Sequence, residues 1–211
     1  MKLAGLLPLV LPLAACTSTV MVQVPPRMTL DREQTIGIVG FQVEGDPRAD
    51  TDVTRQFLEA IQQGQPGVAV VELGDPAAVL GAVGKSAFDG QAAQEIGKKY
   101  DVDAVIVGSL AMKESKPKVD VGLDQGFNLS SLQAEVRLDG NLDAKVLDTS
   151  RGATLWTGSS SRWINVAHVG GGPGYGSINI PDRNRQVAQL VYDMVQEAST
   201  DFRPTWERQP K

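Results

Sequence analysis

The sequence is poor in the residues that build disulfide frameworks and metal centres. Its 211 residues include one cysteine, Cys16, and one histidine, His168. One cysteine cannot close an internal disulfide, and one histidine without cysteine partners cannot make a zinc site of the usual kind. Aromatic residues are also few, at 5% of the chain, while glycine, alanine and valine are plentiful. This composition is typical of an α/β core of small residues, and no metal or cofactor is predicted.

Long hydrophobic runs are absent, apart from one that begins directly after Met1 and Lys2. Residues 3–13 form an apolar stretch that contains Pro8 and Pro12. A helix of about 11 residues is too short for the ~30 Å hydrocarbon core of a bilayer, and the prolines weaken it further. The stretch is therefore typical of a signal peptide rather than of a retained transmembrane span.

The apolar stretch ends in Leu13-Ala14-Ala15-Cys16, which resembles a bacterial lipobox. The resemblance implies cleavage between Ala15 and Cys16, a diacylglyceryl group on the Cys16 thiol, and acylation of the new amino terminus. Sulfur suits this role because it is the strong nucleophile among the small side chains. Residues 1–15 are then a lipoprotein signal peptide. An ordinary secretory signal followed by a chance cysteine is the alternative.

The mature chain is mildly acidic. Loss of Lys2 with the signal peptide moves the formal net charge from −5 to −6. This balance argues against nucleic acid as a partner and against broad binding to anionic head groups. Three acyl chains on Cys16 would hold the protein on a membrane. Thr17, rather than aspartate, follows the cysteine, and in lipoproteins of this kind that implies export to the outer membrane, with the protein facing the periplasm.

Hydrophobic periodicity predicts one α/β domain at residues 34–203, between a lipidated tether at 16–33 and a loose tail at 204–211. Val24-Pro25-Pro26 predicts an extended tether. Strands are expected at 35–43, 68–73, 103–110, 134–146 and 153–161, and helices at about 51–63, 75–81, 89–100 and 182–202. The order β-α-β-α-α-β-β-β-α predicts a mixed-sheet α/β sandwich with residues 103–110 in the middle of the sheet.

Fragments of catalytic motifs occur, but none is complete. Gly84-Lys85-Ser86 resembles the end of a phosphate-binding loop, yet the glycine required five positions earlier is replaced by Val79. The glycines at 170–176 lack the strand and helix of a dinucleotide-binding turn and indicate a flexible loop or hairpin tip.

Candidate catalytic side chains are equally isolated in the sequence. His168 is interpreted as a solvated loop residue, and the serines at 159–161 lack a G-x-S-x-G elbow. Four acidic residues have no spacing that indicates a catalytic pair: Asp101, Asp103, Asp120 and Asp124. No enzyme activity is therefore predicted.

Two polar insertions, at 113–131 and 163–181, contain short alternating segments. The apolar positions are Val119, Val121, Leu123, Phe127 and Leu129 in the first insertion, and Ile164, Val166, Ile178 and Ile180 in the second. Each insertion is predicted to form a β-hairpin with one apolar face. Because a membrane-crossing strand needs ~9–11 alternating residues, and Lys116, Lys118, Asp120 and Asp124 crowd the first insertion, hairpins outside the membrane are favoured.

Three segments, together with the lipobox and the Pro-Pro tether, resemble the CsgG/LpoB-like envelope lipoproteins: residues 35–41 (TIGIVGF), 100–109 (YDVDAVIVGS) and 145–156 (KVLDTSRGATLW). This family includes the curli secretion channel and the outer-membrane activators of penicillin-binding proteins. The resemblance covers about residues 35–202. It implies an α/β domain like the anticodon-binding fold, facing the periplasm, with no chemistry of its own. Cys16 is the site residue that it carries over.

Channel members of this family carry membrane hairpins where the two insertions lie, whereas activator members have short loops there. Because the alternating arms are short, we expect a non-enzymatic adaptor that resembles the activators and binds a periplasmic protein or itself. The alternative is a subunit of a curli-type oligomeric secretion channel, with arms completed by residues 131–137. A third possibility, an undetected hydrolase, would need a polar cleft with an activated carboxylate or serine.

Overall fold

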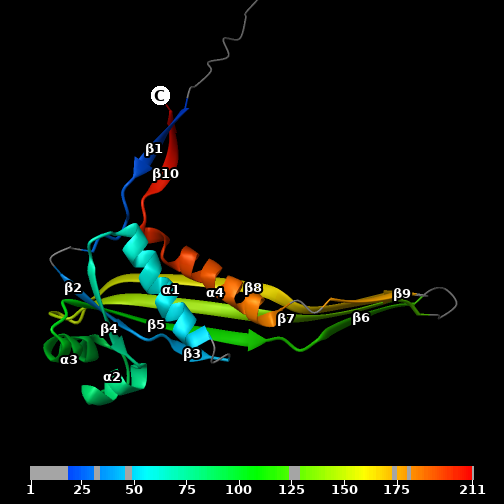
Figure 1. Ribbon diagram of the computed structural model, residues 1–211, viewed down its shortest axis with the longest axis horizontal. Coiled ribbons are helices and arrows are strands. Elements are labelled where there is room, and N and C mark those ends of the chain that lie inside the picture. Colours follow the sequence, from blue (N-terminus) through cyan, green and yellow to red (C-terminus); the bar gives the residue numbers. More distant parts are fainter. Residues whose placement is uncertain are drawn as a thin grey trace, which may run out of the picture.

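The computed structural model describes residues 19–30, 34–45, 49–123, 129–172, 175–179 and 182–210. The predicted signal peptide, Cys16 and residues 124–128 of the first insertion lie outside these residues. Figure 1 shows three parts: an α/β body, a long β extension on one side of it, and a two-stranded ribbon formed by the two ends of the described chain.

The sheet of the body is mixed, as the sequence predicts. Its main path follows the order β4 (Ala69–Gly74), β2 (Thr35–Val39), β5 (Ala104–Glu114), β7 (Leu129–Asp148), β8 (Thr154–Gly172) and β9 (Tyr175–Asn179), with β3 (Gln42–Glu44) paired to β5 and β6 (Lys118–Leu123) paired to β7. β2 pairs in parallel with β4 and β5, and the strands from β5 to β9 pair antiparallel. β5 lies between β2 and β7, which confirms the interior place predicted from its apolar run.

Helices cover both faces of this sheet, and each face has its own apolar cluster (Figure 1). α1 (Ala49–Gly64) and α4 (Arg183–Ala198) pack on one face, and α2 (Pro76–Ala82) and α3 (Gly90–Tyr100) on the other. Six apolar residues of α4 are buried: Val187, Leu190, Val191, Met194, Val195 and Ala198. The α/β fold class is thereby confirmed. No helix of the described residues is both long and apolar enough to span a bilayer.

Helix ends follow the local sequence closely. Side-chain oxygens of Asp75, Asp89 and Asp182 accept backbone N–H groups at the start of α2, α3 and α4, which satisfies donors that have no partner inside the helix. α1 begins at Ala49, slightly before the predicted start at about residue 51.

An aromatic cluster fixes the end of α4 and the short helix η1 (Thr200–Phe202) against the sheet. The Trp156 ring meets Phe202 edge-on with ring centroids 4.6 Å apart, and it lies 6.3 Å from Phe57 on α1. The Trp156 indole N–H donates to an Asp201 carboxylate oxygen at 3.1 Å. Trp156 is buried and anchors β8 in the core.

The segments expected to be a tether and a loose tail pair with each other instead. β1 (Thr19–Val24) and β10 (Thr205–Pro210) run antiparallel, from Thr19 opposite Pro210 to Val24 opposite Thr205. We call this two-stranded sheet the ribbon. The loose tail was a wrong prediction, because the two partners lie at opposite ends of the chain and no turn between them signals the pairing.

One buried glutamine, just beyond α1, joins the base of the ribbon to the body. The Gln65 side-chain oxygen accepts the Leu30 N–H at 2.6 Å, and its Nε2 donates to the carbonyls of Met28 and, at 3.2 Å, Phe202. The Met28 N–H also donates to the Asp201 carbonyl at 2.9 Å. Leu30 and Gln65 are both buried, so water cannot replace these bonds. The segment that follows β1 and the segment that precedes β10 are thereby both fixed to the end of α1.

The turn between β7 and β8 is organised by Asp148. One carboxylate oxygen accepts the Ser150 N–H at 2.7 Å and the Ser150 hydroxyl at 2.6 Å, and the other accepts two N–H groups of Arg151 at 2.8 and 2.6 Å. The Ser150 hydroxyl and the Arg151 guanidinium hold the pKa of Asp148 far below its ordinary value, because they bind the ionised form.

Replacing Gln65 with leucine should lower the free energy of unfolding by about 2–3 kcal/mol, because buried backbone groups of Leu30 and Phe202 lose their partner. Urea denaturation followed by tryptophan fluorescence measures the change. Gln63→Leu, at an exposed position on α1, is the matched control. Equal stabilities of the two variants would show that Gln65 does not hold the base of the ribbon.

Asp148→Asn should destabilise the protein by roughly 1–2 kcal/mol at pH 7, because the amide cannot replace the bonds made by the carboxylate. Because the pKa of Asp148 is lower in the folded protein than in the unfolded chain, its carboxylate stabilises the fold at any pH above the unfolded-state pKa of about 3.9. This stabilisation is lost as the pH falls toward the folded-state pKa. The variant should therefore lose less stability than the wild type below about pH 4. Unfolding temperatures measured from pH 7 down to pH 2 test this, with Asp143→Asn, exposed on the same strand, as the control. Parallel pH curves for wild type and Asp148→Asn would contradict the assignment.

Candidate assembly surface

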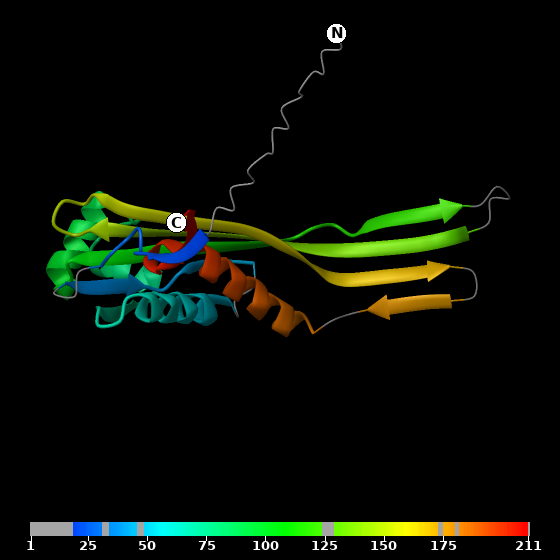
Figure 2. The same ribbon diagram turned by 90° about the horizontal axis from the view of Figure 1, so that it is seen from above.

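Both polar insertions form antiparallel hairpins whose inner strands continue the sheet of the body. β7 has 20 residues and β8 has 19, so each runs unbroken from the body into the extension. β6 pairs with the outer part of β7, and β9 with the outer part of β8. Figure 2 shows these four strands side by side beyond the helices. We call this extension the blade; it comprises β6, residues 129–137, residues 164–172 and β9.

The two hairpins confirm the sequence prediction, but the inner strands are longer than predicted. β7 begins five residues before the predicted start at 134, and β8 continues eleven residues past the predicted end at 161. The signal was present in the sequence, since the alternation of residues 134–146 continues backwards through Leu132. The prediction treated the insertions as separate units and so missed that each hairpin shares a strand with the body.

Strand pairing gives the blade one apolar and one polar face. Residues opposite each other in a sheet share a face, and neighbours along a strand alternate between faces. One register row joins Val119, Ala134, Val169 and Ile178, and the next row joins Lys118, Glu135, His168 and Asn179. Toward the tip, the same alternation joins Val121, Leu132, Gly171 and Gly176 in one row and Asp120, Gln133, Gly170 and Ser177 in another.

The apolar face of the blade continues the face that α4 covers in the body. Leu138 on β7 is buried under this layer. Gly140 lets α4 approach so closely that a Cβ at this position would lie 2.9 Å from the Met194 sulfur. α4 does not extend over the blade (Figures 1 and 2). In the blade, the side chains of Val119 and Val121 are 55% and 56% exposed. In the described part of the chain, the helical layer therefore stops while the apolar face goes on.

The blade also has two free edges. Within the described residues, β6 pairs with β7 alone and β9 with β8 alone. Unpaired N–H and C=O groups along an edge strand are a template for another strand. An uncovered apolar face between two such edges is suited to assembly with further copies or with another β-rich protein.

The motif fragments found in the sequence have structural roles. Gly84, with φ of 66°, follows the end of α2 in the left-handed region, and Lys85 donates to the Gln91 side chain at 3.1 Å. The Ser160 hydroxyl donates to Glu197 at 2.8 Å and so links β8 to α4. Hydrogen bonds from Ser160 and Arg162 hold the pKa of Glu197 below its ordinary value.

Asp101 and Asp103 line one pocket beside α3, and each also has a structural role. The Asp103 carboxylate accepts the Thr35 N–H at 2.8 Å, and Asp101 caps the C-terminus of α3 with φ of 55°. Asp120 lies on β6 in the blade, and Asp124 falls outside the described residues. His168 lies in β8 opposite Asn179, so its placement in a loop was wrong, because β8 extends through it. No group of three or more His, Cys, Asp or Glu residues in the described ranges could hold a metal ion.

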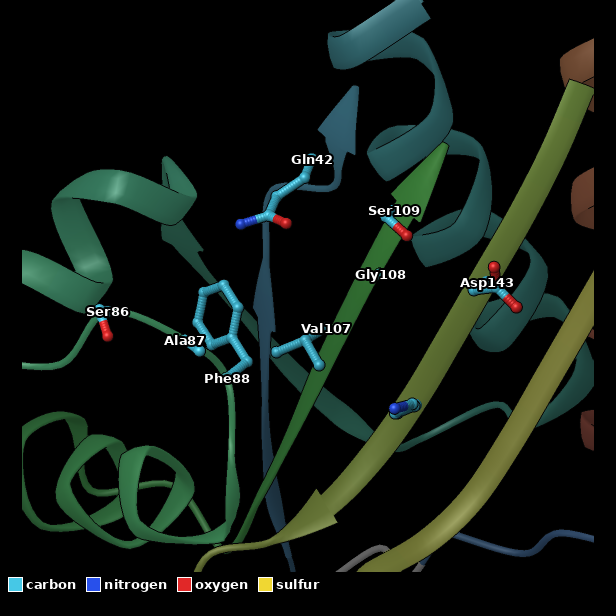
Figure 3. A pocket seen from close by; sticks show the side chains of 9 residues that line it. Gln42, Ser86, Ala87, Phe88, Val107, Gly108, Ser109 and Asp143 are labelled. Carbon is cyan, nitrogen blue, oxygen red and sulfur yellow. The ribbon is translucent and has the colours of Figure 1, made fainter. Parts of the chain in front are cut away.

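A cavity of about 440 Å³ lies between the loop after α2 and the sheet. Figure 3 shows Ser86 and Phe88 on the loop side, with Ser109 on β5 and Asp143 on β7 across from them. The lining residues include no histidine, the usual base for a serine nucleophile, and the amine among them is that of Lys145. Ser109 and Asp143 are register neighbours on an open sheet face, and we assign no chemistry to the cavity.

The predicted lipidation site lies outside the described residues, as does the predicted cleavage point between Ala15 and Cys16. The described residues begin with Thr19, the first residue of strand β1 in the ribbon. Lipidation of Cys16 therefore stays a prediction from the sequence.

No family model and no curated relative matches the sequence. Several solved structures are similar to this chain. One is the PelC dodecamer from Paraburkholderia phytofirmans, which is 14% identical in sequence and has a TM-score of 0.44. The match covers 88% of this chain and 98% of the PelC chain. Lipoprotein GNA1162 from Neisseria meningitidis is 12% identical, with 76% and 93% covered and a TM-score of 0.41. The LpoB C-terminal domain from Salmonella enterica is 12% identical, with 66% and 84% covered and a TM-score of 0.36. Lipoproteins thus recur among these similar structures, and at such TM-scores no function is carried over from them.

Proposed function

We propose that the protein is a non-enzymatic, lipid-anchored envelope protein whose blade assembles with further copies, as a subunit of an oligomeric secretion channel of the curli type. The observation that supports this function best is the blade, with its two free edges and its uncovered apolar face. A blade left bare in water would expose Val119 and Val121 on the edge strand β6, which is a hazard for aggregation. The two hairpins also occupy the positions at which channel members of the resembling family carry membrane hairpins.

The outer strands of the blade favour a second candidate, the adaptor that resembles activators of penicillin-binding proteins. β6 has six residues and β9 has five, whereas a membrane-crossing strand needs ~9–11. In this candidate the blade binds a periplasmic protein along one edge, and the chain acts as a monomer or small oligomer.

Anchoring and location follow from the sequence in both candidates. A lipidated Cys16 would hold the protein at a membrane surface, and Thr17 directs such a lipoprotein to the outer membrane, with the body in the periplasm. The proposal of no enzyme activity is supported by the structural roles of the motif fragments and by the make-up of the cavity lining.

The native mass of the lipidated protein in mild detergent separates the two candidates. We expect a closed ring of many copies. Val121→Lys adds a charge to the apolar face and should reduce the mass to that of a monomer or small oligomer, because burying an unpaired ammonium is costly. Asp120→Asn changes the net charge by the same amount on the polar face and should leave the ring intact. A wild-type monomer would contradict the channel and favour the adaptor.

Cys16→Ala should abolish lipidation and release the protein from membranes, because no other thiol can receive the diacylglyceryl group. Mass spectrometry of the N-terminal peptide and membrane fractionation measure this outcome. Thr17→Asp is the matched variant: it keeps the lipid and should shift the protein to the inner membrane. Membrane-bound Cys16→Ala protein would show that the anchor is not the lipid.

A further inference from the structure

We infer that the ribbon is a membrane-docking element, in which the face formed by Met21, Trp206 and Arg208 rests on the phospholipid surface where Cys16 is anchored. This inference rests on the lipid anchor of the proposed function. It assigns a role to the C-terminal strand β10, which the sequence treats as a tail.

Covalent geometry holds the ribbon close to the anchor. β1 begins at Thr19, three residues after Cys16. An extended chain spans at most about 3.6 Å per residue, so the Thr19 Cα lies within about 11 Å of the Cys16 Cα. A lipidated Cys16 lies at the membrane surface, which places the Thr19 end of the ribbon there too. Pro210 is paired with Thr19, so the pairing of β1 with β10 brings the far end of the chain to the same surface.

Exposed apolar side chains are concentrated in the ribbon. Nine large apolar residues are exposed among the described residues, and three of them, Val20, Met21 and Trp206, lie in these two six-residue strands. Trp206 is 61% exposed and Met21 is 54% exposed. Tryptophan is favoured at the boundary between lipid and water, because its ring is apolar and its N–H is polar.

Alternation separates the charges of the ribbon onto its two faces. Met21 pairs with Arg208, and Gln23 pairs with Trp206, so these four residues share one face. Glu207 lies between Trp206 and Arg208 and therefore belongs to the opposite face, which also carries Val20. The face that contains Trp206 thus has one guanidinium and no carboxylate. That charge suits lipid phosphates, to which arginine donates well-directed hydrogen bonds.

The ribbon also needs a surface to rest on. An isolated two-stranded sheet is marginally stable in water. The hydrogen bonds of Gln65 hold its base, while the strands stand away from the body (Figure 1). When the ribbon lies flat, a bilayer within reach of Thr19 supplies that second surface over the whole length of the face. A second copy of the chain is the other conceivable occupant, and the experiment below distinguishes it.

Spin labels on single cysteines test the docking directly. Because the Cys16 thiol is consumed by the lipid, Trp206→Cys and Arg208→Cys each offer one free thiol in the full lipidated protein. The variants are reconstituted into vesicles of phosphatidylethanolamine and phosphatidylglycerol, and collisions with oxygen and with a water-soluble nickel complex are measured. Glu207→Cys, on the opposite face of the same strand, and Tyr192→Cys, 49% exposed on α4, are the controls.

We expect labels at 206 and 208 to lose nickel collisions and gain oxygen collisions relative to those at 207 and 192. The expected result is an alternation along β10, with positions 206 and 208 differing from position 207. Each label reports the surroundings of its own position, so the test does not depend on any one substitution leaving the docking unchanged. Nickel collisions at 206 and 208 as frequent as at 192 would overturn the inference. Loss of both nickel and oxygen collisions would also overturn it, since it indicates burial against protein. Failure of the lipid anchor shows separately, as protein that does not float with the vesicles.

Discussion

The hydrogen-bonded ladder between β7 and β8 is the constraint on which the rest of the structure depends. It runs from Leu147 opposite Thr154 in the body to Leu132 opposite Gly171 in the blade. In the body, α4 packs on this ladder and the aromatic cluster around Trp156 closes its end. In the blade, the same two strands hold β6 and β9. The blade is therefore an extension of the core sheet, and its direction is set by the body rather than by a hinge.

The junction between body and blade is braced at one residue, Arg137. The register of the ladder shifts between Val136 and Arg137, and such bulges increase the local twist of a sheet. The Arg137 N–H donates to the Ser115 hydroxyl at 3.0 Å, its guanidinium bonds Asp139 at 2.7 Å, and its charge lies 4.3 Å from the centre of the Trp163 ring. Ser115 directly follows β5 and Trp163 lies on β8, so the twist is fixed from both sides of β7 where the helical cover ends.

Local sequence signals predicted the body well, because each of them acts over a few residues. Aspartate caps fix the starts of three helices, and an unbroken apolar run identifies β5 as an interior strand. The missed features are pairings between distant segments. β1 and β10 have no shared turn, and β7 extends past the residues in which its alternation is strictest. The candidate assembly surface consists of residues that lie opposite one another on four paired strands. Which residues are opposite depends on how the strands pair, and the hydrophobic pattern of each strand alone does not determine this.

The ribbon and the blade together restrict how the protein can lie at a membrane. Figures 1 and 2 show that the ribbon leaves the body across the long axis of the blade. Gln65 holds the base of the ribbon, so this relation between the two parts is fixed by buried hydrogen bonds.

A ribbon standing upright on the membrane would direct the blade along the surface, with its edges open to a periplasmic partner. A ribbon lying flat on the bilayer frees the blade to point along the membrane normal, the orientation that a channel wall requires. Because Trp206 pairs with Gln23, several residues from the membrane end at Thr19, it reaches the lipid only when the ribbon lies flat. Docking of the Trp206 face is therefore the arrangement compatible with a channel, whereas a solvent-exposed Trp206 on an anchored protein belongs with the adaptor.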